Sequence, residues 1–212
     1  MWVQVPPAVP ATLVCHASPP DPARCVDLSR LGSTYAYLLG LYLGDGMLTE
    51  ARRHVWKLRI TLDSRYPGII LRAQSAIAEV GERSPGSSPK VGCVEIHSHW
   101  KHWICCFPQH GRGRKHERPI SLAEWQREVV EWHPEAFLTG LIHSDGCRCV
   151  NKVRGYSYPR YFFSNRSSDI RALFLMACGR IGIQARRAGA WNVSVARRDD
   201  VALLDTFIGP KG

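Results

Sequence analysis

The feature that most constrains the fold of this chain is an internal repeat with an offset of 100 residues. An apolar stretch that ends in Asp-Gly occurs at 35–46 and again at 136–146. The offset between the two aspartates is 145 − 45 = 100 residues. Four positions of the first copy recur in the second, with Gly40, Leu41, Asp45 and Gly46 matching Gly140, Leu141, Asp145 and Gly146. The repeat predicts two similar folding units within the 212 residues.

The pattern after each Asp-Gly predicts the same order of elements in both units. Strands are expected at 47–50 and 55–62, and again at 147–152 and 158–164. Amphipathic helices are expected at 66–80 and 168–181. A strand and a short helix complete each unit, at 91–97 and 99–107, and at 191–196 and 199–208. The predicted fold class is α+β, with two pseudo-symmetric α-β-β-α-β-(β)-α repeats whose bracketed strand leaves no visible pattern.

Composition divides the chain into four segments. Residues 1–29 form a Pro-rich N-terminal extension without a helical or strand period, so an extended arm or a disordered leader is expected there. The first repeat is expected at 30–118 and the second at 134–212. The linker between them, 119–133, contains a helical pattern at about 121–132.

The helix that opens each repeat is apolar nearly all round, so it is expected to be buried. Small residues recur in it at a spacing of four, Gly40 with Gly44 and Gly140 with Ser144. Small side chains at this spacing allow two helix backbones to approach closely. These four residues are therefore the predicted contact between the two opening helices.

The two aspartates follow directly from that contact. If the two helices pack side by side in parallel, Asp45 and Asp145 meet at the C-terminal ends. Neighbouring carboxylates repel each other, and a divalent cation, for which Mg²⁺ suits hard oxygen ligands best, removes the repulsion. The alternative interpretation is a buried helix hairpin whose aspartates only cap turns. Gly46 and Gly146 are expected to supply the left-handed turn that ends each helix.

The charge of the chain favours a polyanionic partner. Lys and Arg number 28 against 18 Asp and Glu, which gives a net charge of +10. Neutralising phosphates releases counterions, so this surplus favours nucleic acid over the alternative of a merely basic surface. No apolar run of about 18 residues and no signal-like segment occur, so no membrane partner is expected. The eight cysteines fit neither a disulfide framework nor zinc knuckles, which favours a reducing, cytoplasmic location.

The two motifs resemble the signatures of monomeric LAGLIDADG homing endonucleases. They read Leu38-Leu-Gly-Leu-Tyr-Leu-Gly-Asp-Gly46 and Leu138-Thr-Gly-Leu-Ile-His-Ser-Asp-Gly146. The resemblance implies saddle-shaped antiparallel sheets around a central helix pair. It implies Mg²⁺ as the cofactor, with Ca²⁺ or Mn²⁺ able to substitute in binding. The metal-binding set it implies is Asp45 and Asp145 with their preceding neighbours Gly44 and Ser144. The earlier acidic position of the motif is Leu43 in one copy and His143 in the other.

The same resemblance implies a catalytic lysine late in each repeat. Lys115 and Lys211 are the candidates, at 115 − 45 = 70 and 211 − 145 = 66 residues after the aspartates. Their alternative is a solvated lysine in a basic loop. Lys101 and Arg197 are the substitutes.

Alternation along the strands identifies candidate DNA contacts. In 55–62 one face is apolar and the other carries Lys57, Arg59 and Thr61. The full set of candidates is Arg52, Arg53, Lys57, Arg59 and Thr61 in the first repeat, and Arg148, Lys152, Arg154, Tyr158 and Arg160 in the second. The sequence does not separate base contacts from phosphate contacts.

Two further clusters are interpreted as structural. His97, His99 and His102 lack other ligands at good spacing, so a polar helix start is favoured over zinc. Cys147 and Cys149 point the same way on a strand and are interpreted as packing residues.

These observations together predict a site-specific, Mg²⁺-dependent double-strand DNA endonuclease in which each aspartate serves one strand. Its expected partner is double-stranded DNA with a long, pseudo-palindromic target, bound by a monomer because both halves lie in one chain. The alternatives are a catalytically silent DNA-binding regulator and an RNA-binding intron maturase.

Overall fold

A computed structural model describes residues 32–209. The Pro-rich extension and Lys211 lie outside the described residues. The first repeat contains α1 (Gly32–Asp45), β1 (Gly46–Glu50), β2 (Trp56–Asp63), α2 (Pro67–Gly81), β3 (Gly86–Lys90), β4 (Cys93–Trp100) and α3 (Trp103–Cys106). The linker contains α4 (Glu124–Trp132). The second repeat contains α5 (Pro134–Asp145), β5 (Gly146–Val153), β6 (Tyr156–Ser164), α6 (Ser168–Arg180), β7 (Ala185–Arg187), β8 (Asn192–Val195) and α7 (Arg198–Phe207).

Each repeat forms one antiparallel sheet of four strands, and the two sheets have the same strand order. The orders are β1-β2-β4-β3 and β5-β6-β8-β7. The first hairpin of each sheet also begins in the same way. The glycine after the motif aspartate opens the first strand and pairs with a residue late in the second strand, Gly46 with Ile60 and Gly146 with Phe163. The predicted α+β class with two similar repeats is therefore confirmed.

The strand that the sequence did not reveal is β3 in the first repeat and β7 in the second. Four of the five residues of β3 are exposed and the fifth is partly buried, so no apolar alternation marks it. β7 has only three residues. Both are edge strands that pair with a single neighbour, β4 or β8. Edge strands need little burial, and for this reason their sequences carry little signal.

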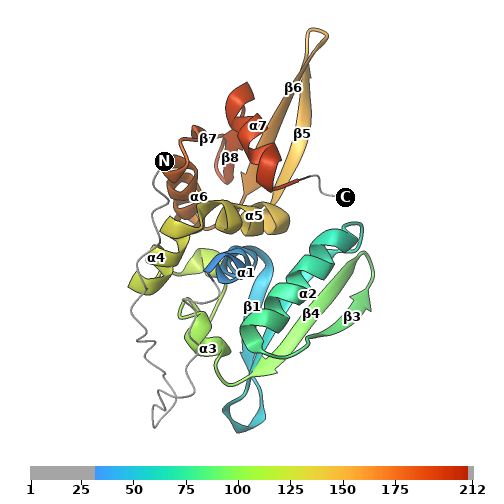
Figure 1. The fold of residues 1–212 in the computed structure, drawn as a ribbon, viewed down its shortest axis with the longest axis vertical. Helices are drawn as coiled ribbons and strands as arrows, with labels where there is room; N and C mark the ends of the chain where they lie inside the picture. Colours follow the sequence, from blue (N-terminus) through green and yellow to red (C-terminus); the bar gives the residue numbers. More distant parts are fainter. Residues whose placement is uncertain (1–31, 210–212) are drawn as a thin grey trace, which may run out of the picture.

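The core lies between the sheets and the helices that cover one face of each (Figure 1). α1 and α5 lie side by side between the two sheets, and Leu38, Leu41 and Leu138 on them are fully buried. α2 and α6 cover the inner faces of the sheets, and Phe174 on α6 stacks on Phe163 of β6 with 4.6 Å between ring centroids. None of the described helices is long and apolar enough to cross a membrane.

The contact between α1 and α5 is made backbone to backbone. A Cβ atom on Gly40 would lie 2.5 Å from the carbonyl oxygen of Phe137, and one on Gly140 would lie 2.2 Å from that of Tyr37. One turn further on, a Cβ atom on Gly44 would lie 2.5 Å from the Cβ of Ser144. The structure thus brings the four small residues of the motifs together, and matching positions face each other.

Gly46 and Gly146 are required for a reason other than the predicted one. Neither adopts a left-handed conformation, and Gly146 is extended at φ −113° and ψ 167°. The chain turns directly from each helix into a strand and folds over the last helical turn. A Cβ atom would lie 2.5 Å from the Cα of Tyr42 at Gly46 and 2.7 Å from the Cα of Ile142 at Gly146. The expectation of a left-handed turn was therefore wrong, and close approach explains both glycines.

We expect Gly40→Ala to lower the free energy of unfolding by about 1–3 kcal/mol, because the added methyl group must separate two helix backbones. Gly179→Ala in α6 is the matched control, since its Cβ would meet nothing within 4 Å. The control should leave stability unchanged or raise it by about 0.5–1 kcal/mol. Urea unfolding compares the two variants, and equal effects would show that Gly40 is not at a close contact.

Candidate metal and nucleic-acid site

The two aspartates of the motifs end α1 and α5 at the same side of the helix contact. Asp45 and Asp145 are both half-buried and line one cavity of about 710 Å³. A Cβ atom on Gly44 would lie 3.1 Å from the Oδ2 of Asp145, which shows how near the end of α1 lies to that carboxylate. The structure therefore brings together the two acids that the repeat singled out.

Lys115 joins the two aspartates at this site. Its Nζ donates to the carbonyl oxygens of Tyr42, of Leu43 at 3.0 Å and of Gly44 at 3.1 Å. These carbonyls belong to the last turn of α1, where a cation is favoured by the helix dipole. Burial lowers the pKa of Lys115 to about 7, although the carboxylates of Asp145 and Asp45 act to raise it. The ammonium is thus poorly solvated and lies close to both acids.

The substitutes for the catalytic lysine lie elsewhere. Lys101 is exposed in the turn between β4 and α3 and does not line the shared cavity. Arg197 immediately precedes α7 in the second repeat and forms an ion pair with Asp200 at 3.9 Å. The structure thus places Lys115, and neither of these two residues, beside the aspartates.

Asn165 is a site residue that the sequence analysis missed. Its Nδ2 donates to the Oδ2 of Asp145 at 2.6 Å, while its Oδ1 accepts from the backbone N–H of Ser167 at 2.8 Å. The amide is thus fixed by the turn that starts α6 and orients the carboxylate of α5. An Asn at the end of a strand is a common turn residue, so nothing in the pattern connected it with the motif.

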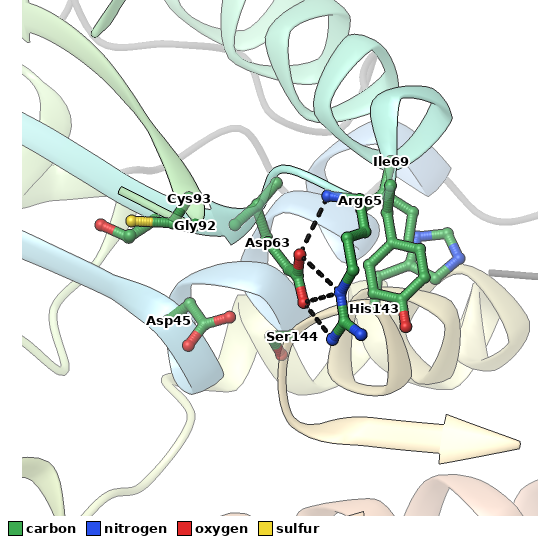
Figure 2. A pocket seen from close by; sticks show the side chains of 11 residues that line it. Asp45, Asp63, Arg65, Ile69, Gly92, Cys93, His143 and Ser144 are labelled. Carbon is green, nitrogen blue, oxygen red and sulfur yellow. Dashed lines mark hydrogen bonds and ion pairs between the residues drawn. The ribbon is translucent and has the colours of Figure 1, made fainter. Parts of the chain in front are cut away.

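In the first repeat, Asp63 forms a similar turn in front of α2. Its Oδ1 accepts from the backbone N–H of Arg65 at 2.9 Å, which is the same local turn. The carboxylate also binds the guanidinium of Arg65 at 2.6 Å (Figure 2). Asp45 and Asp63 line a second cavity of about 420 Å³ together with Ser144. The two halves of the site are therefore chemically unlike, with an amide in one and an ion pair in the other.

The rim of the shared cavity is basic. The basic side chains that line it, apart from Lys115, are those of His110, Arg112, Arg114, His116, Arg118 and Arg166. Most of them come from the Gly-rich loop between α3 and α4, which also contains Lys115 and whose other basic residues were not predicted as part of the site. Burial, followed by the nearby Arg118, lowers the pKa of His110. A polyanion entering this cavity meets positive charge before it meets the two aspartates.

The open face of the first sheet carries the residues expected there. Lys57, Arg59 and Thr61 share the face opposite the buried Leu58 and Ile60. Arg59 pairs across strands with His97, and Lys57 pairs with His99, so two histidines belong to this face. The interpretation of the histidine cluster as a helix start holds for His102, which precedes α3, and fails for the other two. Among the described residues, no group of three or more His, Cys, Asp or Glu is arranged to hold a metal.

The same face contains a buried acid. Glu95 is 7% exposed and binds Lys90 at 2.6 Å and Lys57 at 3.5 Å. The hydrogen bond from Lys90 is the main reason why the pKa of Glu95 lies below its usual range. Two lysines of this face are therefore partly neutralised by the protein itself.

The hairpin tips carry several of the remaining candidates. Arg52 and Arg53 lie in the short helical turn between β1 and β2, and Arg154 lies in the turn between β5 and β6 with a positive φ of 49°. Tyr158 shares the open face of the second sheet with Arg160, because side chains alternate along β6. The structure therefore leaves Arg52, Arg53, Arg154 and Tyr158 among the candidate DNA contacts.

Arg148 and Lys152 alternate to the opposite face of the second sheet. Arg148 pairs across strands with the buried Tyr161, and its guanidinium binds the carboxylate of Asp205 on α7 at 2.7 and 2.8 Å. The structure therefore does not bring Arg148 together with Arg160. Counting from Asp145 explains the difference, because the position of Arg148 matches the buried Leu48 of the first repeat.

Cys147 and Cys149 lie on the open face of the second sheet. Cys147 is exposed and pairs with Phe162, while Cys149 is partly buried and pairs with Arg160. Their interpretation as packing residues is therefore wrong. The two cysteines do share one face of β5, as the alternation predicted, but that face is the open face of the sheet and not the face covered by helices.

The architecture and the site define a duplicated α+β protein whose paired helices end in two neighbouring carboxylates. This is the LAGLIDADG fold, and solved structures of that type match most of the chain. Mesophilic variants of the homing endonuclease I-DmoI are 15% identical, with 84% of this chain and 96% of that chain covered and a TM-score of 0.55. The N-terminal LAGLIDADG domain of DUF199/WhiA is 13% identical, with coverages of 84% and 83% and a TM-score of 0.52.

A third match is the homing endonuclease I-WcaI bound to its DNA recognition sequence. It is 10% identical, with 85% of this chain and 82% of that chain covered and a TM-score of 0.53. No protein-family model and no curated protein matches the sequence. The likeness at these identities is one of fold.

The ion pair of Arg148 gives a pH-dependent prediction. Arg148 holds the pKa of Asp205 below its ordinary value of 3.8, so the pair stabilises the fold above that pH and the contribution is lost as the pH falls through the lowered pKa. We expect Arg148→Ala to be less stable than the wild type at pH 7 by at most about 1 kcal/mol, since the pair is partly exposed. The difference should shrink below pH 3.8 in thermal unfolding. Arg83→Ala, which removes an exposed charge after α2, should show no such pH dependence.

Proposed function

We propose that this protein is a site-specific double-strand DNA endonuclease that uses a divalent metal ion, Mg²⁺ in the first place. The observation that carries the proposal is the meeting of Asp45, Asp145 and Lys115 at one cavity with a basic rim. Two half-buried carboxylates that meet at the end of a helix pair repel each other, and packing alone gives no reason to bring them together. They suit a reaction at a phosphodiester bond, where negative charge must be bound and stabilised.

The residues present fit a magnesium ion. The donors are hard carboxylate oxygens, and Mg²⁺ is commonly held by one or two carboxylates with substrate phosphates completing its shell. Asp45 and Asp145 would hold it. The carbonyl oxygen of Gly44 already accepts from Lys115, and the Ser144 hydroxyl donates back to the carbonyls of Gly140 and Leu141. When bound, the metal polarises the phosphate and lowers the pKa of a bound water.

The protein side chains have separate tasks in this proposal. Asp45 and Asp145 would each serve one DNA strand, and Asn165 fixes the orientation of the second carboxylate. Lys115 would balance negative charge at the phosphate, since it already lies close to both acids and donates to carbonyls of the last turn of α1. The basic rim would draw the backbone of the duplex toward the cavity.

DNA as the substrate is supported by the open faces of the two sheets and by the charge of the chain. Basic side chains lie on both faces, and the net charge is +10. The I-WcaI structure contains a bound DNA recognition sequence, and a structure of I-AabMI, with a TM-score of 0.52, contains uncleaved DNA. Both halves of the site belong to one chain, so we propose that a monomer binds one long, pseudo-palindromic target.

A regulator that binds DNA without cutting it is the second candidate. The similarity to the LAGLIDADG domain of DUF199/WhiA favours it, because that match is of the same quality as the matches to nucleases. The two candidates differ in what the aspartates do, and this difference decides between them.

We expect Asp45→Asn to lower cleavage of a selected duplex in Mg²⁺ by at least about 100-fold while leaving binding within about threefold, because Asn keeps the shape but removes the charge that attracts a cation. Asp145→Asn should behave in the same way. Asp199→Asn, an exposed acid in the first turn of α7, is the control and should cut normally. A wild type that binds its duplex but does not cut it in Mg²⁺ or Mn²⁺ would establish the regulator.

Binding should depend steeply on salt. We expect the logarithm of the association constant to fall with the logarithm of salt concentration with a slope of several units, because each neutralised phosphate releases counterions. Fluorescence anisotropy with a labelled duplex in Ca²⁺ measures this slope. A flat dependence would contradict a nucleic-acid partner.

A further inference from the structure

Two cysteines on the open face of the second sheet take no part in the function proposed above. Cys147 and Cys149 lie on β5, and the thiols of both are free. Cys147 is exposed and Cys149 is partly buried, whereas Cys105, Cys106 and Cys178 are buried. Among residues 32–209, Cys147 is the one exposed cysteine, so it is the thiol that a solute reaches first.

The fold does not require a thiol at either position. Counting from the motif aspartates, Met47 and Thr49 of β1 match the two cysteines. Met47 is exposed and Thr49 is partly buried, as their counterparts are. The first repeat therefore builds the same start of a strand without thiols, and the pair in the second repeat needs another explanation.

The two thiols lie within reach of each other. Alternate residues of a strand share a face, and the two cysteines pair across to Phe162 and Arg160 of β6. Burial is the main cause that raises the pKa of Cys149, and the neighbouring Cys147 raises it further, partly through a hydrogen bond between the two side chains. The sulfur atoms therefore lie next to each other on the open face.

A structural zinc site does not account for the pair. Such a site usually takes four Cys or His ligands. In the described part of the chain, no third His, Cys, Asp or Glu joins the two cysteines in a group that could hold a metal. Two neighbouring thiols have another common chemistry, which is reversible oxidation to a disulfide.

A disulfide between the two cysteines has to shorten β5. Alternate Cα atoms of an extended strand lie about 6.6 Å apart, whereas a disulfide usually joins Cα atoms about 5.5–6 Å apart. The bond therefore requires the strand to bend, and this strain makes the disulfide easy to reduce again. Such a bond suits a reversible modification better than a permanent link.

A bend at this point of β5 reaches the candidate metal site. α5 ends at Asp145 and β5 begins at Gly146, with no loop between them. Gly146 has no free space, because a Cβ atom there would lie 2.7 Å from the Cα of Ile142. A change at Cys147 is therefore passed on to Asp145, since no loop separates them.

We propose that Cys147 and Cys149 form a redox modification site, which a small-molecule disulfide such as oxidised glutathione converts reversibly into a Cys147–Cys149 disulfide that disturbs Asp145. The exposed sulfur of Cys147 attacks one sulfur of the oxidant, breaks its S–S bond and releases one molecule of glutathione. The sulfur of Cys149 then attacks that of Cys147 and releases the second molecule. The protein gives up two electrons and two protons, which end in the S–H bonds of the two glutathione molecules.

Trypsin makes the linkage directly measurable, because it cuts after Arg148, between the two cysteines. The two thiols then lie on separate peptides, residues 128–148 and 149–152. The full-length protein is equilibrated in glutathione buffers of increasing oxidised fraction, its remaining thiols are alkylated, and the digest is measured by mass spectrometry. We expect the two peptides to be joined in oxidising buffer and separate after treatment with excess reduced glutathione.

Single substitutions separate the two steps. Cys149→Ser should leave glutathione attached to Cys147, because the second step is lost, and Cys147→Ser should give no joined peptides. Cys93→Ser, which removes a partly buried cysteine of the first sheet, is the control and should give the joined peptides as the wild type does. If both thiols are still alkylated in fully oxidising buffer, or if glutathione stays on Cys147 of the wild type, the proposal is wrong.

The effect on the metal site has its own readout, which rests on the proposed function. We expect the oxidised wild type to cut a selected duplex in Mg²⁺ about 10-fold or more slowly than the reduced protein, because a small displacement of a reacting group costs much of the rate. Excess reduced glutathione should restore the rate, and Cys147→Ser should cut equally fast before and after the oxidising treatment.

The two readouts fail separately. Joined peptides together with an unchanged cleavage rate would contradict the link to Asp145. If the reduced wild type binds its duplex but does not cut it, the proposed function fails, and the peptides still decide whether the redox site exists.

Discussion

The close contact between α1 and α5 is the interaction on which the rest of the structure depends. Gly40 and Gly140 let the two backbones touch, and every atom larger than hydrogen at these positions would push the helices apart. Because the sheets are attached directly to the ends of these helices, the contact also sets the distance between the two halves. Asp45 and Asp145 come together as a consequence, since each is the last residue of its helix. Packing and the site thus share one cause.

The two repeats agree closely in backbone structure but differ in the side chains around the site. Strand order and hairpin pairing agree between the repeats, yet the turn before α2 contains the ion pair of Asp63 with Arg65, while the turn before α6 contains Asn165, which binds Asp145. Lys115 caps the end of α1, while on α5 the imidazole of His143 contacts the carbonyl oxygen of Ile208 and the hydroxyl of Tyr37. The backbone must match because the helices meet near a pseudo-twofold axis. The side chains around the axis are under no such requirement.

The sequence predicted what rests on periodicity and repetition. The two motif helices are apolar and buried nearly all round, the central strands and the covering helices bury one apolar face, and Leu58 and Ile60 lie where the alternation put them. It did not predict β3 and β7, which bury almost nothing, nor the role of Asn165, which depends on where a turn directs one side chain. Arg148 shows a third limit. Its basic character suggested a DNA contact. Because side chains alternate along β5, however, Arg148 lies on the helix-covered face of the sheet and binds Asp205.

The helix α4 joins the two halves into one chain, and this has a consequence for how such a protein diversifies. In a symmetric dimer of identical subunits every substitution appears twice. Here a change on one sheet leaves the other untouched, so each half is free to acquire its own preferences. A new half has to match its neighbour mainly at the close contact of α1 and α5, where Gly40 and Gly140 face each other. Recombining halves between relatives then requires mainly that this one helix contact is preserved.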